Sequence, residues 1–229
     1  MPDKYRFVPH GVMAFAKTLA TIIAFNRNHG VYRSLRRDEP VDGSGERVPW
    51  FTYPAIEYLA AFDFSDRVLF EYGAGQSTLY WAKRFKRVVS VEHDEQWFVR
   101  IRDLAPTNAT ILFAPAREEY VRAIEQLNRA CDVVVIDGMW RRECAQLALQ
   151  CLSPDGMIIL DNADWYPTIA EQMRANGLLE VDFSGFSPLA WFATTTSFFF
   201  RPSTILQRGF HNPQPIGGRK GGELVEGGV

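Results

Sequence analysis

Acidic residues stand at or near the ends of four apolar runs along the chain, and this placement points to chemistry. Glu71 follows "RVLF", Glu92 ends "RVVSVE", Asp137 ends "DVVVID" and Asp161 ends "GMIILD". A single acid in front of a helix is common, because Asp and Glu cap helix N-termini. Four acids at comparable positions indicate instead that carboxylates gather at one ligand-binding edge.

The elements that must position these acids alternate regularly. Strand-like runs at 67–72, 87–92, 110–115, 132–137 and 156–161 are separated by helical patterns at 76–85, 94–104, 117–129 and 141–152. A helix near 167–176 and two further strands follow. Because the runs are continuously apolar, the strands are expected to be buried on both faces of a doubly wound α/β sheet. In such sheets ligands bind beyond the carboxyl ends of the strands.

The segment "EYGAGQST" turns the first strand into a helix through Gly73 and Gly75. A dinucleotide fingerprint needs a third glycine at the position of Thr78, which is missing. Glu71 also brings negative charge to the turn, which suits a cationic ligand better than a pyrophosphate. Since Glu92 can accept hydrogen bonds from a ribose diol, the pattern predicts a nucleoside with a cationic amino-acid tail.

These motifs, with "VVSVEHD", "DVVVIDG" and "MIILDN", resemble the class I S-adenosylmethionine-dependent methyltransferases over about residues 65–202. "WFTYPAIEYL" and "VIDGMWRREC" resemble a bacterial group that methylates small molecules. The resemblance implies a Rossmann-like, doubly wound, mostly parallel seven-stranded sheet with helices on both faces and an antiparallel last strand. It also implies S-adenosylmethionine as the cofactor.

Carried over position by position, the resemblance assigns Glu71, Gly73 and Gly75 to the first cofactor motif. Ser77 stands where the family usually has its third glycine, and small residues replace that glycine readily. Glu92 would bind the ribose hydroxyls. The list of predicted cofactor contacts is completed by His93, with Asp94 as its alternative near the adenine, and by Asp137.

Three oxygen-bearing side chains on adjacent strand ends, Asp137, Asp161 and Asn162, could hold Mg²⁺. The arrangement resembles catechol-type O-methyltransferases, in which a metal activates substrate hydroxyls. The sequence departs from that group because Arg141 stands near the place of its lysine base, and arginine is a poor base. The alternative is metal-free: Asp137 is the catalytic base or substrate anchor, and Asp161 and Asn162 cap the next helix.

Aromatic residues follow the same strand ends. Trp140, Trp165 and Tyr166 are predicted to form flat apolar walls for the substrate, and "WFTY" at 50–53 is expected to fold over them as a lid.

The bulk composition restricts the partners. The formal charge of -2 gives no reason to expect nucleic acid. Three cysteines with no recommended pairing predict a cytoplasmic protein. The apolar segment 11–25 is too short to span a bilayer and predicts an amphipathic helix, which packs on the domain, on a second copy in a homodimer, or on a membrane surface.

We therefore predict an N-terminal helical appendage at 1–49, a methyltransferase domain at 50–205 and a mobile tail at 206–229. The predicted activity is methyl transfer from S-adenosylmethionine to an oxygen, or less readily a nitrogen, of a small molecule. The alternatives are a non-catalytic binding module of the same fold, or an aminopropyl- or nicotinamide-dependent enzyme.

Overall fold

The structure is a computed structural model that describes residues 10–127, 130–209 and 215–217. The described residues form a seven-stranded sheet in the order β3-β2-β1-β4-β5-β7-β6. Strands β1 to β5 run parallel, and β7 pairs antiparallel with both β5 and β6. The predicted fold class, including the antiparallel last strand, is confirmed.

The observed elements agree closely with the sequence pattern. The strands are β1 Phe64–Tyr72, β2 Phe85–Glu92, β3 Ala109–Phe113, β4 Cys131–Ile136, β5 Leu152–Leu160, β6 Leu179–Phe186 and β7 Ala193–Phe200. The helices are α1 His10–His29, α2 Val31–Arg37, α3 Tyr53–Ala60, α4 Gln76–Ala82, α5 Glu95–Leu104, α6 Arg117–Arg122, α7 Arg141–Cys151 and α8 Pro167–Ala175, with short 3-10 helices η1 Ala123–Leu127 and η2 Ala163–Trp165.

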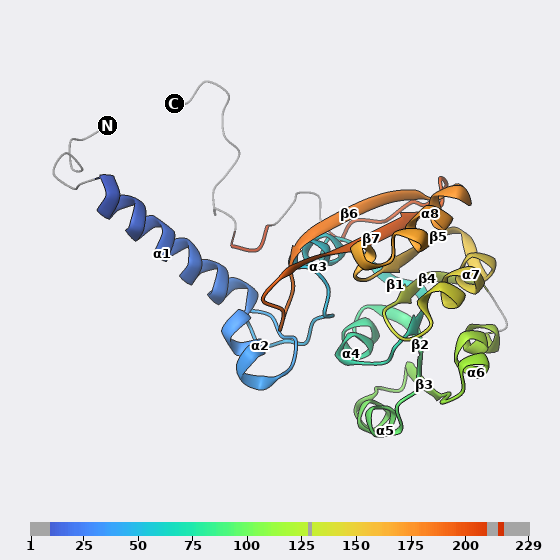
Figure 1. Ribbon diagram of the computed structural model, residues 1–229. Helices are drawn as coiled ribbons and strands as arrows, with labels where there is room; N and C mark the ends of the chain where they lie inside the picture. The colour runs from blue at the N-terminus through green and yellow to red at the C-terminus, as the bar shows by residue number, and fades with distance from the viewer. Residues whose placement is uncertain (1–9, 128–129, 210–214, 218–229) are drawn as a thin grey trace.

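Helices lie on both faces of the sheet (Figure 1). A hydrophobic core fills the space between sheet and helices on each face. Alternate residues of one strand serve opposite cores: Phe70 packs with α6, α7 and α8, whereas Leu69 packs with α3 and α4. This alternation explains the unbroken apolar runs, because a strand covered on both faces has no side for polar residues.

The strand order reverses between β1 and β4, where the loops that follow these strands touch. Gly73 has φ +96°, a conformation that favours glycine, and a Cβ there would lie 2.9 Å from Gly138 Cα. The Asp137 amide donates to the Tyr72 carbonyl at 3.1 Å. Crossings of this kind are where open α/β sheets bind ligands.

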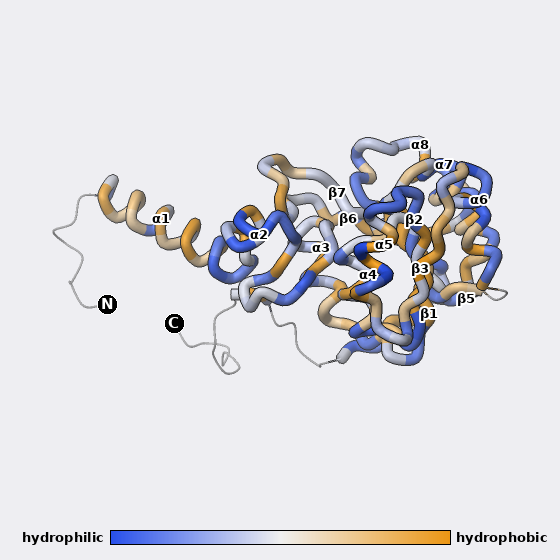
Figure 2. Tube along the Cα trace, turned by 90° about the horizontal axis from the view of Figure 1, so that it is seen from below, coloured by the Kyte–Doolittle hydropathy of each residue, from blue (hydrophilic) through white to orange (hydrophobic). Residues whose placement is uncertain are grey.

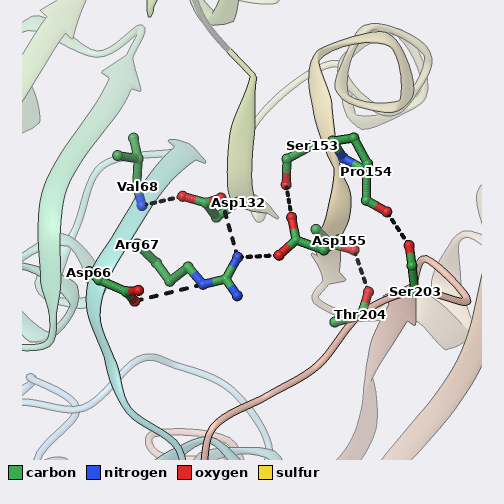
Figure 3. Close-up of polar contacts among 10 residues, drawn as sticks. Asp66, Arg67, Val68, Asp132, Ser153, Pro154, Asp155, Ser203 and Thr204 are labelled. Atoms are coloured by element: carbon green, nitrogen blue, oxygen red, sulfur yellow. Dashed lines mark hydrogen bonds and ion pairs between the residues drawn. The ribbon is translucent and has the colours of Figure 1, made fainter.

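Polar contacts hold the opposite edge of the sheet together (Figure 3). Arg67 at the start of β1 donates to Asp155 Oδ2 at 2.7 Å, and Asp132 Oδ2 accepts from the Val68 amide at 2.7 Å. These contacts tie the amino ends of β1, β4 and β5 together, so the register is fixed at the edge away from the strand tips.

Helix α1 leads away from the domain and exposes its apolar residues (Figures 1 and 2). None of its residues is buried; Phe15 is 71% exposed and Ile22 59%. Among the described residues, no helix is long and apolar enough to cross a membrane. The predicted tail at 206–229 falls mostly on 210–214 and 218–229, outside the described residues, and the predicted domain boundaries stay predictions.

The residue at the start of α3 does not cap the helix with its side chain. Thr52 occupies the N-cap position, but its hydroxyl donates to the Phe183 carbonyl at 2.8 Å instead of capping the helix. Its amide is held by Thr196 Oγ1. The residues ahead of α3 are therefore anchored on β6 and β7, close to the strand tips.

Candidate functional site

A first cavity of about 700 Å³ opens at the crossing between β1 and β4. This volume suits a small-molecule or cofactor ligand. Its walls come from the glycine turn after β1, the end of β2, the loop after β4 and a segment ahead of α3. The wall residues include Asp38, Glu39, Trp50, Gly73, Gly75, Gln76, Ser77, Glu92, His93, Asp94, Trp97, Arg100, Asp137, Gly138 and Arg141.

Glu71 does not reach this wall, although the sequence suggested a cofactor contact. Its side chain is fully buried below the glycine turn, where it accepts hydrogen bonds from Thr78 Oγ1, Trp81 Nε1 and Ser90 Oγ at 2.5–3.0 Å. Thr78 Oγ1 in turn accepts from the Gly75 amide at 3.0 Å. Glu71 therefore supports the turn and the start of α4 from beneath.

Burial raises the pKa of Glu71 to about 7, although the hydrogen bonds to its carboxylate oppose this shift. The physical reason is that desolvation penalises the charged form more than the neighbouring donors stabilise it. The carboxyl group is thus poised between its two protonation states near neutral pH.

Glu92 lies at the end of β2 with one oxygen engaged and one available. Glu92 Oε1 accepts from the amides of His93 and Asp94 at 2.8 and 2.9 Å and also contacts His93 Nδ1 at 2.8 Å. Its Oε2 receives no hydrogen bond from the residues the structure describes. Because the carboxylate is 4% exposed and borders the first cavity, Oε2 is a fixed acceptor for a ligand hydroxyl.

The first cavity is rich in negative charge and holds an unsatisfied polar atom. Five carboxylates and two guanidinium groups border it. Gln76 Nε2 donates to Glu39 Oε1 at 3.2 Å, whereas the buried Gln76 Oε1 has no hydrogen-bond partner. Glu39 Oε1 also accepts from Arg100 Nη2 at 2.8 Å. Such a surface suits a ligand with net positive charge and a donor for Gln76.

Arg141 binds the ends of β4 and β5 together. Its Nη2 donates to Asp137 Oδ1 at 2.9 Å, and its Nη1 donates to the Asp161 carbonyl at 2.6 Å and to Asn162 Oδ1 at 3.3 Å. Burial raises the pKa of Asp137, and the Arg141 charge opposes this. Burial and the nearby Asp137 charge raise the pKa of Asp161 well above its ordinary value.

A second cavity of about 330 Å³ adjoins the first. The two cavities share three wall residues, which are Trp50, Asp137 and Arg141. The remaining wall of the second cavity is formed by Asp161, Asn162, Trp165, Ser187, Ala190, Phe192 and Thr194. A ligand in each cavity would therefore meet the other beside Asp137.

Of the three predicted aromatic walls, the structure brings only Trp165 to the second cavity. Trp140 and Tyr166 line a separate hollow on the other side of Arg141. The Trp140 ring packs against Tyr120 and His93, with centroids 5.2 and 5.9 Å away, and Tyr166 lies 5.0 Å below the guanidinium of Arg141. Both therefore support the site, and neither borders either of the two cavities.

Comparison with known proteins identifies the fold. No protein-family model and no curated protein matches the sequence. The precorrin-6y C5,15-methyltransferase of Geobacter metallireducens superposes with a TM-score of 0.53 and 18% identity, over 65% of this chain and 87% of that one. The chain has the fold of a class I S-adenosylmethionine-dependent methyltransferase.

Two further solved structures are similar with TM-scores below 0.5. A methyltransferase from Pyrococcus furiosus has a TM-score of 0.46 and 17% identity, over 81% of this chain and 99% of that one. An rRNA methylase from Streptococcus thermophilus has a TM-score of 0.46 and 14% identity, over 64% and 95%.

On this class I fold, the predicted metal ligands do not fit a metal site. Arg141 already engages Asp137 Oδ1 and Asn162 Oδ1, so a guanidinium lies where a divalent cation would need these oxygens. Asp161 Oδ1 instead accepts from Thr196 Oγ1 at 2.6 Å. In the part of the chain that the structure describes, no group of three or more His, Cys, Asp or Glu side chains could hold a metal ion.

The prediction that Asp161 and Asn162 cap the next helix with their side chains is wrong. Asn162 stands at the N-cap position of η2 with φ +51°, but its side chain makes no capping hydrogen bond. Its Nδ2 donates to Thr194 Oγ1 at 3.3 Å. The pair thus connects the tip of β5 to Arg141 and β7.

Several residues in the wall of the first cavity had no signal in the sequence. Asp38 and Glu39 lie in the predicted appendage, yet they border the first cavity. Trp97 Nε1 donates to the Ala74 carbonyl and closes the glycine turn from α5. Of the wall residues ahead of α3, only Trp50 was anticipated, because "WFTY" was expected to fold over the strand tips.

Proposed function

We propose that the protein transfers a methyl group from S-adenosylmethionine to a small-molecule acceptor. The observation that supports this proposal is the pair of adjoining cavities that share Asp137, Arg141 and Trp50. The first cavity suits the cofactor and the second suits an acceptor. When bound, S-adenosylmethionine supplies a methyl group activated by its sulfonium.

The residues of the first cavity fit this cofactor. Glu92 Oε2 can accept from the ribose hydroxyls, and the unsatisfied Gln76 Oε1 can accept from the ammonium of the amino-acid tail. The excess of carboxylates on the wall favours a ligand with net positive charge. His93 and Asp94 continue the wall beyond Glu92, on the side proposed for the adenine.

The residues between the cavities position the acceptor. Asp137, whose pKa is raised by burial, is a better proton acceptor near neutral pH than an ordinary aspartate. Arg141 fixes the orientation of this carboxylate. Trp50 borders both cavities. A ring folded over bound ligands at this place would exclude water and so strengthen the electrostatic interactions around them.

Whether the methylated atom is an oxygen or a nitrogen stays a prediction. The preference for oxygen rested partly on a metal that binds hydroxyl groups, and Arg141 removes that support. A small-molecule acceptor, a cytoplasmic location and a homodimer formed through α1 belong to the same proposal.

Isothermal titration with S-adenosylhomocysteine tests the proposal. We expect binding to the wild type, binding weakened on the order of tenfold in Glu92→Gln, and unchanged binding in Glu118→Gln, which makes the same chemical change at an exposed position. The absence of both binding heat and a thermal shift at saturating ligand would reject the cofactor assignment.

A second measurement separates an enzyme from a non-catalytic binding module. The protein is incubated with a small-molecule cell extract and S-adenosylmethionine that carries a labelled methyl group. Label in a small molecule supports the enzyme. Cofactor binding without any labelled product supports the binding module.

A further inference from the structure

The second cavity offers carboxylate oxygens that the protein itself does not satisfy. Asp137 Oδ1 is paired with Arg141, but Asp137 Oδ2 receives no hydrogen bond within the described residues. Asp161 is 3% exposed and accepts from Thr196 through Oδ1, while no described side chain donates to its other oxygen. Both residues border the cavity, so both carboxylates can accept from its occupant; that of Asp161 also interacts with the Asn162 amide.

Arg141, the cation in the wall of the second cavity, has no hydrogen-bond donor left for an anionic ligand. A guanidinium has five N–H donors. In Arg141, Nε donates to the Gly138 carbonyl at 3.0 Å, Nη1 donates to Asp161 O and Asn162 Oδ1, and Nη2 donates to Asp137 O and Asp137 Oδ1. All five donors are therefore used by the protein, and none remains for a carboxylate or phosphate.

Aromatic rings form the rest of the opening. Trp50, Trp165 and Phe192 border the cavity while staying 49%, 56% and 40% exposed. The Trp165 and Phe192 rings lie 6.1 Å apart at 33° to each other. Exposed rings beside unpaired carboxylates are a typical binding surface for organic cations, because the ring face carries partial negative charge.

We infer that the second cavity binds an acceptor with an ammonium group on a flat apolar body and rejects anionic molecules of the same shape. The inference rests on the proposed function, because it assigns the ligand of the cavity that adjoins the proposed cofactor site. The ammonium pairs with the carboxylates of Asp137 and Asp161, and the apolar body lies against Trp165 and Phe192.

The test compares three ligands that share a phenyl ring and differ in charge: phenethylamine, phenethyl alcohol and hydrocinnamate. Each is titrated into full-length protein saturated with S-adenosylhomocysteine. We expect the amine to bind at least about tenfold more tightly than the alcohol, since a charge-assisted hydrogen bond replaces a neutral one. The acid should not bind measurably.

Two Asp→Asn variants locate the effect. Asp161→Asn should reduce the preference for the amine over the alcohol severalfold and leave the heat of S-adenosylhomocysteine binding unchanged. Asp182→Asn, an equivalent change at an exposed position on β6, should leave the preference unchanged. If Asp161→Asn does not fold, the ranking of the three ligands on the wild type decides alone.

Acid binding as tight as amine binding, equal affinity for amine and alcohol, or binding of none of the three would each overturn the inference. A failure of the proposed function has a different signature, which is the absence of S-adenosylhomocysteine binding. The ranking of the three ligands can still be measured on the free protein in that case.

Discussion

The buried carboxyl group of Glu71 should make the stability of the protein fall as the pH rises. Glu71 is fully buried, and burial raises its pKa from the ordinary 4.5 to about 7. Between these two values the unfolded chain has released this proton, whereas the folded chain retains it. The folded state then binds more protons, so the free energy of unfolding decreases with increasing pH across this window.

The magnitude follows from the two pKa values. At about 1.4 kcal/mol for each pH unit, the step from 4.5 to about 7 amounts to about 3 kcal/mol of lost stability. Glu71→Gln cannot titrate, so it lacks this slope. The variant also leaves one of the donors Thr78, Trp81 or Ser90 badly paired, which adds a penalty that does not depend on pH.

The assay is urea denaturation of wild type and Glu71→Gln from pH 4 to 8, followed by tryptophan fluorescence. The difference in unfolding free energy, wild type minus variant, should fall by about 3 kcal/mol over this range. Glu118→Gln, an exposed control, should show no such trend. A constant difference, or one that rises with pH, would refute the reasoning, because hydrogen bonding would then outweigh burial at Glu71.

Three further predictions concern the site and the first helix. The melting temperature of the wild type should be the same in Mg²⁺ and in EDTA. Arg141→Ala should cost about 1–3 kcal/mol by chemical denaturation, because it removes the donor to the half-buried Asp137 carboxylate and to the Asp161 carbonyl. A lower melting temperature in EDTA would contradict the metal-free site. Gly138→Ala should lower the free energy of unfolding by about 1–3 kcal/mol and weaken S-adenosylhomocysteine binding, because a Cβ there overlaps the Tyr120 hydroxyl. A variant as stable and as tightly binding as the wild type would contradict this prediction, because the loop would then have moved to make room. Phe15→Glu on α1 should shift the sedimentation coefficient from dimer to monomer, and a monomeric wild type would exclude the proposed dimer.

The sequence was a good guide to the sheet because burial on both faces leaves an unbroken apolar run, which few other environments produce. The predicted strand at 132–137, for instance, is observed as Cys131–Ile136. The glycine turn could also be predicted from the sequence, since Gly73 adopts a positive φ, which favours glycine, at the crossing of β1 and β4. These features are local or periodic, so they can be recognised without knowing the tertiary contacts.

The positions of the acids were less predictable, because one residue along a strand changes the face. Glu71 lies inside β1, so its side chain points under α4 and is buried. Glu92 is the last residue of β2, and Asp137 follows β4, so both reach the cavity. Strand ends are uncertain by a residue or two from sequence alone, and this uncertainty decides whether an acid meets a ligand or a helix.

The convergence of strand tips creates an electrostatic demand that the chain meets only in part. Asp137 and Asp161 are brought close by adjacent parallel strands, and their repulsion must be offset by positive charge. One guanidinium, from Arg141, is shared between them, and it binds the carboxylate of Asp137 but only the main-chain oxygen of Asp161. The pKa values of both acids stay raised in spite of this cation. A positively charged acceptor would supply the missing charge, so the electrostatics that replace a metal by arginine also favour an ammonium-bearing substrate.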